Sequence, residues 1–240
     1  MKRQELLERL RTVIRINGHI LTVATGNGMS SRYAITGGAD LLLAMNAGRF
    51  RQMGQSAFSP FFGYVNCNEM VMTYGSREIL PVVGDFPVIF GMCMQDPGIG
   101  LYDYLRKTDE VGFSGVINYP PYCLMDGRFR DALEQNGFGF EREIEGIRLA
   151  HFLDIFTVAY VTDMKEALQM SEAGADVICI HFGILGGGLL GASSMMSLES
   201  ALKHADEIFT ALERVNPDAI RLICGGPVQT PIDAQLFYRN

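Results

Sequence analysis

The sequence has few of the residues that mark the commonest catalytic and structural scaffolds. It contains five cysteines, an odd number without a CxxC pair, which argues against a disulfide framework and against a cysteine zinc site. Neither an HxH pair nor an HExxH motif occurs, so the zinc hydrolase sites that spacing can reveal are unsupported. All four lysines fall on segments that we predict to be helices, which leaves a Schiff-base mechanism without an obvious lysine.

Long apolar runs and an excess of positive charge are also missing. The formal net charge is -7 and the basic residues are scattered, so we expect neither nucleic acid nor a membrane surface as a partner. Residues 1–16 alternate charged and apolar side chains at helical spacing and lack the continuous apolar stretch of a signal peptide or membrane span. We therefore expect a soluble, cytoplasmic protein.

Seven short apolar runs, each followed by a stretch of helical character, dominate what is present. This alternation predicts an α/β fold with a parallel sheet, and 240 residues is close to the roughly 250 of a (β/α)8 TIM barrel. We predict one barrel domain over residues 1–240, with residues 1–17 as an amphipathic helix that caps its bottom. The runs begin at His19, Asp40, Pro87, Gly115, Asp154, Asp176 and Arg221.

An eighth apolar run does not follow the seventh. The last residues, CGGP and then PIDAQLFYRN, predict only the beginning of a helix, so the barrel lacks its eighth strand. Three alternatives remain: the barrel stays open, a neighbouring subunit supplies the segment, or the chain is a fragment. An open barrel would expose two strand edges, and for this reason we expect a homo-oligomer.

Helices are predicted between the strands, with start signals at two of them. Asp163 and Ser197 each precede a glutamate closely, as in a capping box. The predicted spans are Asn68–Leu80, Leu101–Val111, Asp126–Asn136, Glu141–His151, Met164–Ala173 and Ser197–Val215.

The ends of the first two strands carry residues suited to an anion. Gly26, Asn27 and Gly28 form a glycine-rich turn before a helix, where backbone N–H groups and the helix dipole favour negative charge; a simple tight turn is the alternative. Asn46 and Arg49 follow the second strand on a predicted short loop. The planar guanidinium suits a carboxylate or phosphate, although arginine is also a common surface residue.

Candidate groups for a metal and for substrate orientation follow the third and fourth strands. Asp96 can hold Mg²⁺ or accept a proton, and it is equally suited to cap a helix because Pro97 follows it. Asn118 ends the fourth strand and is a candidate for orienting the substrate. We expect Asp126 to cap the next helix and Tyr160 to pack at the end of the fifth strand.

The sixth and seventh strands end in a histidine and in glycines. A neutral imidazole at His181 can act as a general acid or base near pH 7; the alternative is a hydrogen-bonded core histidine. Three glycines at 186–188 suit a lid or an anion nest. Gly225 and Gly226 stand where barrels often bind phosphate. Cys224 has no partner histidine that would make it a nucleophile.

Several blocks together resemble one known family. The segments TGNGMSSRY, NAGRF, LMDGRF, EAGADVICIHFG and CGGP, in this order along nearly the whole chain, are similar to the phosphoenolpyruvate hydrolase-like family of TIM-barrel proteins. That family is itself similar to the C-terminal part of a plant viral-resistance protein. The resemblance implies a phosphoenolpyruvate/pyruvate-type barrel, with Mg²⁺ and a small phosphorylated or oxo-acid substrate. The chain departs from the family at Cys224, Leu185, Gly186 and Arg32, where histidine, two threonines and lysine are usual.

Two functions follow as expectations. The first is a hydrolase or lyase-type enzyme acting on a substrate such as phosphoenolpyruvate or phosphonopyruvate. In it Arg49 and the turn at 26–28 grip the anion, Asp96 holds Mg²⁺ and His181 moves the proton. The second is a binding or signalling module that keeps the barrel without catalysis.

Overall fold

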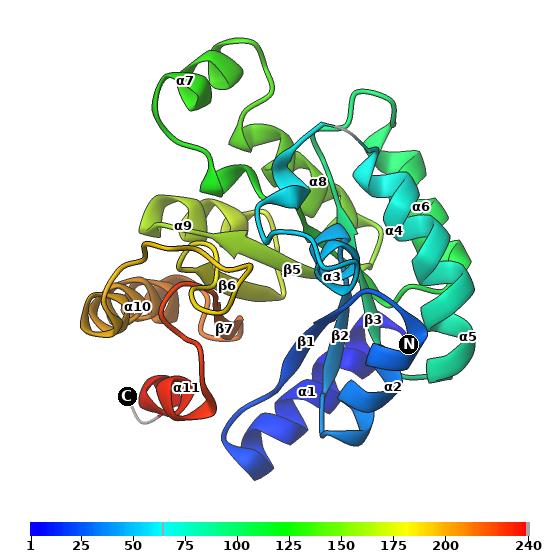
Figure 1. The fold of residues 1–240 in the computed structure, drawn as a ribbon, viewed down its shortest axis with the longest axis horizontal. Helices are drawn as coiled ribbons and strands as arrows, with labels where there is room; N and C mark the ends of the chain where they lie inside the picture. The colour runs from blue at the N-terminus through cyan, green and yellow to red at the C-terminus, as the bar shows by residue number, and fades with distance from the viewer. Residues whose placement is uncertain (64, 239–240) are drawn as a thin grey trace.

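The computed structural model describes residues 1–63 and 65–238, and its seven strands form one parallel sheet that curls into an open barrel (Figure 1). The strand order β1 to β7 follows the order of the chain, with a helix on the outside of each crossover. The predicted α/β barrel without an eighth strand is therefore confirmed. The strands are β1 Thr22–Thr25, β2 Leu41–Ala44, β3 Val88–Met92, β4 Gly115–Asn118, β5 Phe156–Val161, β6 Val177–His181 and β7 Ile220–Cys224.

The middle strands are buried on both faces, as expected for a parallel sheet covered by helices on one side and filled on the other. Every residue of β2, β3, β4 and β5 is buried, whereas most residues of β1 and β7 are only half-buried. This contrast follows from the topology, because β1 pairs with β2 and β7 pairs with β6, and the two outer edges face the gap left by the missing strand.

The helices fall close to the predicted spans. They are α1 Arg3–Asn17, α2 Gly28–Thr36, α3 Asn46–Gln52, α4 Cys67–Tyr74, α5 Leu80–Val83, α6 Leu101–Val111, α7 Gly127–Gln135, α8 Phe140–Phe152, α9 Met164–Glu172, α10 Leu198–Val215 and α11 Pro231–Tyr238. Three short turns of helix, η1 Ser59–Phe61, η2 Gly75–Ile79 and η3 Tyr122–Leu124, lie between them. Asp163 and Ser197 cap α9 and α10 as predicted, since their side chains accept from the amides of Glu166 and Ser200.

Three local expectations were wrong. The single helix expected from Asn68 to Leu80 is split by the π-turn η2, because Pro81 has no amide hydrogen to continue the α-helical pattern. The segment 46–49, expected as a loop, is the first turn of α3. Asp96 does not cap a helix: α6 begins at Leu101, and Gly100 stands at its cap position.

The first helix closes the amino-terminal end of the barrel. Leu6, Leu7 and Leu10 of α1 are buried in the core. Arg3 reaches across to Asp176, just before β6, with nitrogen–oxygen distances of 2.8 to 3.1 Å. Asp176 is itself buried and accepts from the amide and hydroxyl of Thr157. A polar clasp thus joins the start of the chain to the sixth strand.

The C-terminal helix lies beside the gap between β1 and β7 (Figure 1). The ring of Tyr238 stacks on that of His19 with 4.9 Å between the centroids, and Phe237 contacts Phe182. The helix therefore links the two ends of the sheet without adding a strand. Throughout the part of the chain that the structure describes, every helix is too short or too polar to span a bilayer.

Candidate active site at the barrel mouth

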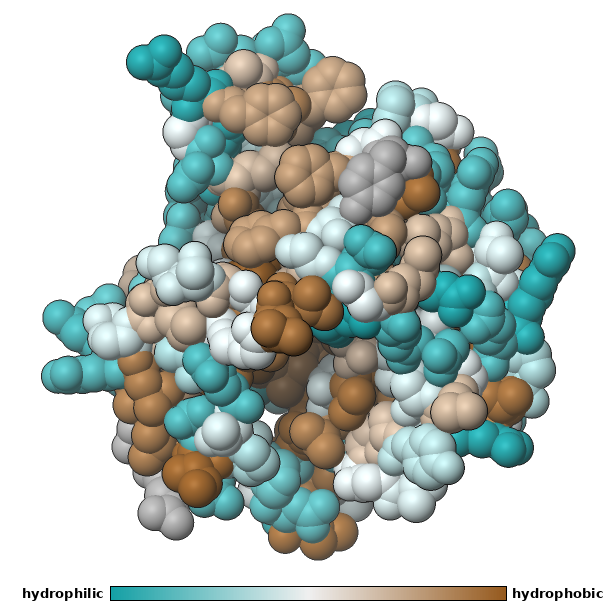
Figure 2. Space-filling model, in the orientation of Figure 1, coloured by the Kyte–Doolittle hydropathy of each residue, from teal (hydrophilic) through white to brown (hydrophobic). Residues whose placement is uncertain are grey.

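A cavity of about 1790 Å³ opens at the carboxyl ends of the strands and continues along the gap between β1 and β7. Figure 2 shows the hollow in this face, bordered by apolar side chains. Because side chains alternate along a strand, every second residue points inward. The inward residues are apolar in the lower barrel (Leu43, Ile117, Val158, Leu222) and carry functional groups at its mouth (Tyr119, Tyr160, His181, Cys224).

His181 ends β6 and presents one ring nitrogen to this cavity. Its Nδ1 accepts a hydrogen bond from the amide of Gly183 at 3.1 Å, so the proton of the neutral ring is on Nε2. Burial lowers the pKa of His181 to about 4, because the charged imidazolium is poorly solvated there. At neutral pH the side chain is therefore an uncharged N–H donor.

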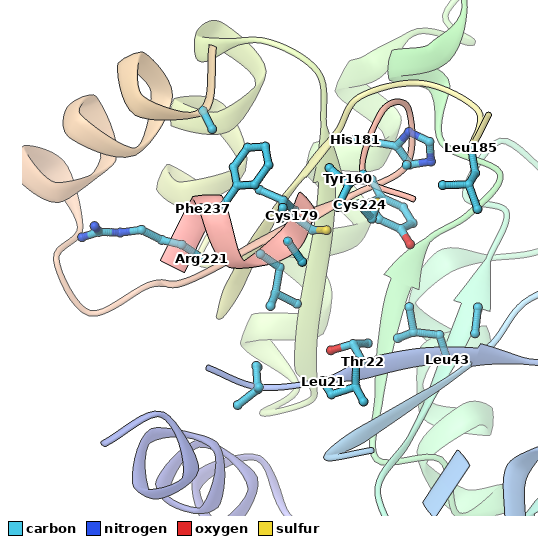
Figure 3. A pocket seen from close by; sticks show the side chains of 18 of the residues that line it. Leu21, Thr22, Leu43, Tyr160, Cys179, His181, Leu185, Arg221, Cys224 and Phe237 are labelled. Atoms are coloured by element: carbon cyan, nitrogen blue, oxygen red, sulfur yellow. The ribbon is translucent and has the colours of Figure 1, made fainter. Parts of the chain in front are cut away.

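Aromatic rings form a continuous row beside His181. Phe61 lies 6.3 Å from Tyr119, Tyr119 lies 6.0 Å from Tyr160, and Tyr160 lies 5.1 Å from His181, measured between ring centroids. In Figure 3 Tyr160, His181 and Cys224 lie on one side of the cavity, and Thr22 and Leu43 lie on the other. Burial raises the pKa of both tyrosines well above the usual value, so both remain neutral O–H groups.

Asn118, predicted to orient a substrate, is fully buried and holds the protein's own backbone. Its Oδ1 accepts from the amide of Tyr160 at 2.7 Å, and its Nδ2 donates to the carbonyl of Tyr160 at 3.1 Å. The same Nδ2 donates to Glu143 at 2.7 Å. Asn118 therefore fixes the position of Tyr160 instead of facing the cavity.

Glu143 is the residue that sequence reasoning missed. It lies on α8, is fully buried, and accepts from Asn118 and from the amide of Tyr122 at 2.8 Å. Burial raises the pKa of Glu143 to about 7, against the lowering effect of these two donors. A signal was present: Glu143 shares the buried face of its helix with Phe140 and Ile144, at spacings of three and one.

Arg49, predicted to grip an anion, is engaged elsewhere. Its Nη1 lies 3.0 Å from the carboxylate of Glu78 and 3.2 Å from the carbonyl of Gly26, and its guanidinium lies 5.7 Å from the centre of the Tyr74 ring. Arg51, two positions further along α3, lines the cavity instead. Its positive charge acts on the hydroxyl of Tyr119 and opposes the burial effect on the pKa of that group.

The glycine-rich turn at the end of β1 serves packing. A side chain on Gly26 would collide with the backbone of Gly48, and one on Gly28 would collide with the carbonyl of Glu78. Asn27 caps α2 by accepting from the amide of Ser30 at 2.8 Å. These glycines let α2 and α3 approach the sheet closely, and they lie outside the set of described residues that line the cavity.

Asn46 also lies behind the wall of the cavity. Its Nδ2 donates to the thiol sulfur of Cys67 at 2.9 Å and points to the carbonyl of Pro60 at 3.4 Å. Its Oδ1 is buried without a hydrogen-bond partner among residues 1–63 and 65–238. Asn46 thus anchors the segment that follows α3.

Asp96 is held in a network of amides. Its Oδ2 accepts from Asn66 at 2.8 Å and from Asn68 at 3.1 Å, and its Oδ1 accepts from the amide of Gly98 at 2.8 Å. Although partial burial opposes them, these donors lower the pKa of Asp96. Within the described ranges there is no cluster of three histidine, cysteine or acidic residues suited to a metal. The residues around Asp96 therefore do not fit Mg²⁺, which prefers several oxygen ligands.

The last two strand ends are tied together by backbone hydrogen bonds. The amide of Gly226 donates to the carbonyl of Gly183 at 3.0 Å, and that of Gly186 donates to Gly226 at 3.2 Å. Gly225 and Gly226 have φ values of +77° and +53°, which glycine adopts without strain. Gly225 borders the cavity beside the His181 ring, so the predicted loop is close to the site.

Curled parallel strands with neutral donors at their carboxyl ends define a TIM-barrel-type α/β protein. The chain belongs to the phosphoenolpyruvate hydrolase-like family, whose model matches residues 5–240. This confirms the resemblance read from the sequence.

Longer proteins contain regions similar to this chain. It is 37% identical over 233 residues to the ToMV susceptible protein tm-1(GCR26) of Solanum lycopersicum, covering 97% of this chain and 31% of that protein. It is 35% identical over 230 residues to the putative transcriptional regulatory protein y4pA of Sinorhizobium fredii, covering 95% of this chain and 38% of that protein. The chain thus spans about a third of these relatives.

Solved structures of low sequence identity share the fold. Phosphoenolpyruvate phosphomutase from Streptomyces platensis subsp. rosaceus superimposes with a TM-score of 0.57 at 15% identity, over 91% of this chain and 80% of that one. A phosphonopyruvate hydrolase complexed with oxalate and Mg²⁺ gives a TM-score of 0.58 at 15% identity, over 94% and 81%. These similarities establish the barrel architecture.

Proposed function

We propose that the protein is a hydrolase or lyase-type enzyme that acts on a small oxo acid or phosphorylated oxo acid. The observation that carries the proposal is the neutral Nε2–H donor of His181 beside the tyrosine hydroxyls, at the mouth of a deep cavity. Breaking a bond next to a carbonyl group places negative charge on the carbonyl oxygen. Fixed donors in a partly dry site stabilise that charge.

His181 takes the part of a donor in this proposal. A general base needs a pKa near the working pH, whereas burial keeps the pKa of His181 at about 4. The neutral ring can still stabilise an oxyanion through Nε2. Asn118 and Glu143 act indirectly, because they hold the backbone that positions Tyr119 and Tyr160.

Mg²⁺ remains a prediction from the family, and no step here passes through a metal, because the ligands around Asp96 do not fit one. The open edges of β1 and β7 support our further proposal that the chain forms a homo-oligomer.

Phosphorus NMR of the protein with phosphoenolpyruvate or phosphonopyruvate, in Mg²⁺ or in EDTA, tests the proposal. We expect loss of the substrate signal, at least tenfold slower in His181→Gln and unchanged in His19→Gln, a histidine at the opposite end of the strands. Loss of turnover in EDTA and in Asp96→Asn would instead support a metal at Asp96.

The departures at Cys224 and Leu185 favour a second candidate, a barrel that binds a ligand without catalysis. Absence of turnover with every oxo acid, in both Mg²⁺ and EDTA, would refute the enzyme and support this module.

A further inference from the structure

We propose that Arg51 and the hydroxyl of Tyr119 form an anion-binding subsite at the mouth of the barrel, which takes a carboxylate or phosphate group. Both residues border the cavity, Arg51 from α3 and Tyr119 from the end of β4. The identity of the anion as part of a substrate rests on the proposed function. The presence of the subsite does not.

The geometry of α3 separates the roles of its two arginines. Successive residues of a helix are turned by about 100°, so Arg49 and Arg51 point to roughly opposite faces. Arg49 is neutralised by Glu78 at 3.0 Å on the face turned toward η2. Arg51 is directed to the cavity and is solvent-exposed, with no ion pair to any residue in the described ranges.

The other charges along the cavity leave its mouth positive. Arg221 approaches Glu213 at 3.9 Å, and Arg11 donates to the carbonyl of Asp218 at 3.2 Å. Both contacts lie toward the amino-terminal ends of the strands, far along the cavity from α3. Arg51 is thus the charged side chain nearest to Tyr119 among the described lining residues, and an anion entering the mouth meets uncompensated positive charge.

The chain around Arg51 also provides partial shelter from water. The amide of Ala57 donates to the carbonyl of Leu190 at 3.1 Å, which ties the segment after α3 to the glycine-rich loop after β6. Leu185, Leu190 and Gly54 line the same part of the cavity. A charge-assisted hydrogen bond gains strength in such surroundings, and a guanidinium can hold both oxygens of a carboxylate.

The test is calorimetric titration with oxalate and with inorganic phosphate, in EDTA, on the full chain. Arg51→Gln should weaken binding of at least one probe by tenfold or more, and Tyr119→Phe by about threefold. Arg51→Lys should recover part of the affinity, because it restores the charge without the two-pronged geometry. Arg128→Gln, which removes an exposed arginine from α7, is the matched control and should bind as the unaltered protein does.

Equal affinity in Arg51→Gln and the unaltered protein would overturn the inference, and so would failure of the unaltered protein to bind either probe. Thermal unfolding of each variant shows whether it is folded. If binding depends on Arg51 but no oxo acid is turned over, the subsite stands and the proposed enzyme falls. If turnover occurs while Arg51→Gln binds and reacts normally, the enzyme stands and the subsite falls.

Discussion

Replacing Glu143 by glutamine should remove a large part of the protein's pH-dependent stability. The folded protein binds a proton at Glu143 with a pKa of about 7, whereas the value for a solvated glutamate is 4.5. Between these two pH values the folded protein keeps a proton that the unfolded chain has released. The free energy of unfolding therefore falls as the pH rises.

The magnitude follows from the two pKa values. Each pH unit between 4.5 and about 7 costs about 1.4 kcal/mol, so Glu143 should account for a loss of about 3 kcal/mol across this interval. The stabilisation is complete below pH 4.5 and is absent above about pH 7. Two neighbouring charges, those of Glu166 and Arg130, act on the group in opposite directions and leave burial as the main cause.

Urea unfolding at pH 5, 6, 7 and 8 measures this effect. The difference in unfolding free energy between pH 5 and pH 8 should be smaller in Glu143→Gln by about 3 kcal/mol. The variant should also lose about 1–3 kcal/mol at pH 5, because its amide nitrogen faces one of the two donors that the carboxylate accepts.

Glu145→Gln, an exposed neighbour on the same helix, is the control and should keep the normal pH dependence. An identical pH dependence in Glu143→Gln and the unaltered protein would refute the reasoning, because it would mean that Glu143 ionises as freely in the folded as in the unfolded state.

Two further substitutions test the packing and the clasp. Gly48→Ala should lower the free energy of unfolding by about 1–3 kcal/mol, since its methyl group would collide with the carbonyl of Thr25; unchanged urea unfolding would contradict this close approach. Asp176→Asn should cost about 3 kcal/mol, because it removes the charge that pairs with Arg3 and weakens the acceptor for Thr157. A thermal unfolding midpoint equal to that of the unaltered protein would show that the clasp contributes nothing.

The strands were predictable from the sequence because each is a short apolar run that ends in small or polar residues. All seven predicted runs contain a strand, from β1 after His19 to β7 after Ala219. The helices were less predictable where local chemistry competes with periodicity. Pro81 interrupted one of them, and the short α3 formed in a segment without a polar cap.

The site was harder to predict, because function depends on which way a side chain points. Arg49 and Arg51 are two positions apart, and only their contacts show that one pairs with Glu78 while the other borders the cavity. His181 was identified from its strand end, but its tautomer depends on the amide of Gly183. Glu143 lies in a charged segment and looks like a surface residue until its place on the buried face is seen.

The clasp between Arg3 and Asp176 also bears on the order in which the ring is assembled. Each strand pairs with its neighbour along the chain, so the sheet can grow by short-range pairing alone. The clasp instead joins positions 173 residues apart, and closing so long a loop costs about 5 kcal/mol in chain entropy. An interaction of this separation becomes favourable only once the intervening strands are in place. The clasp is therefore expected to form late in folding and to break early when the ring begins to open.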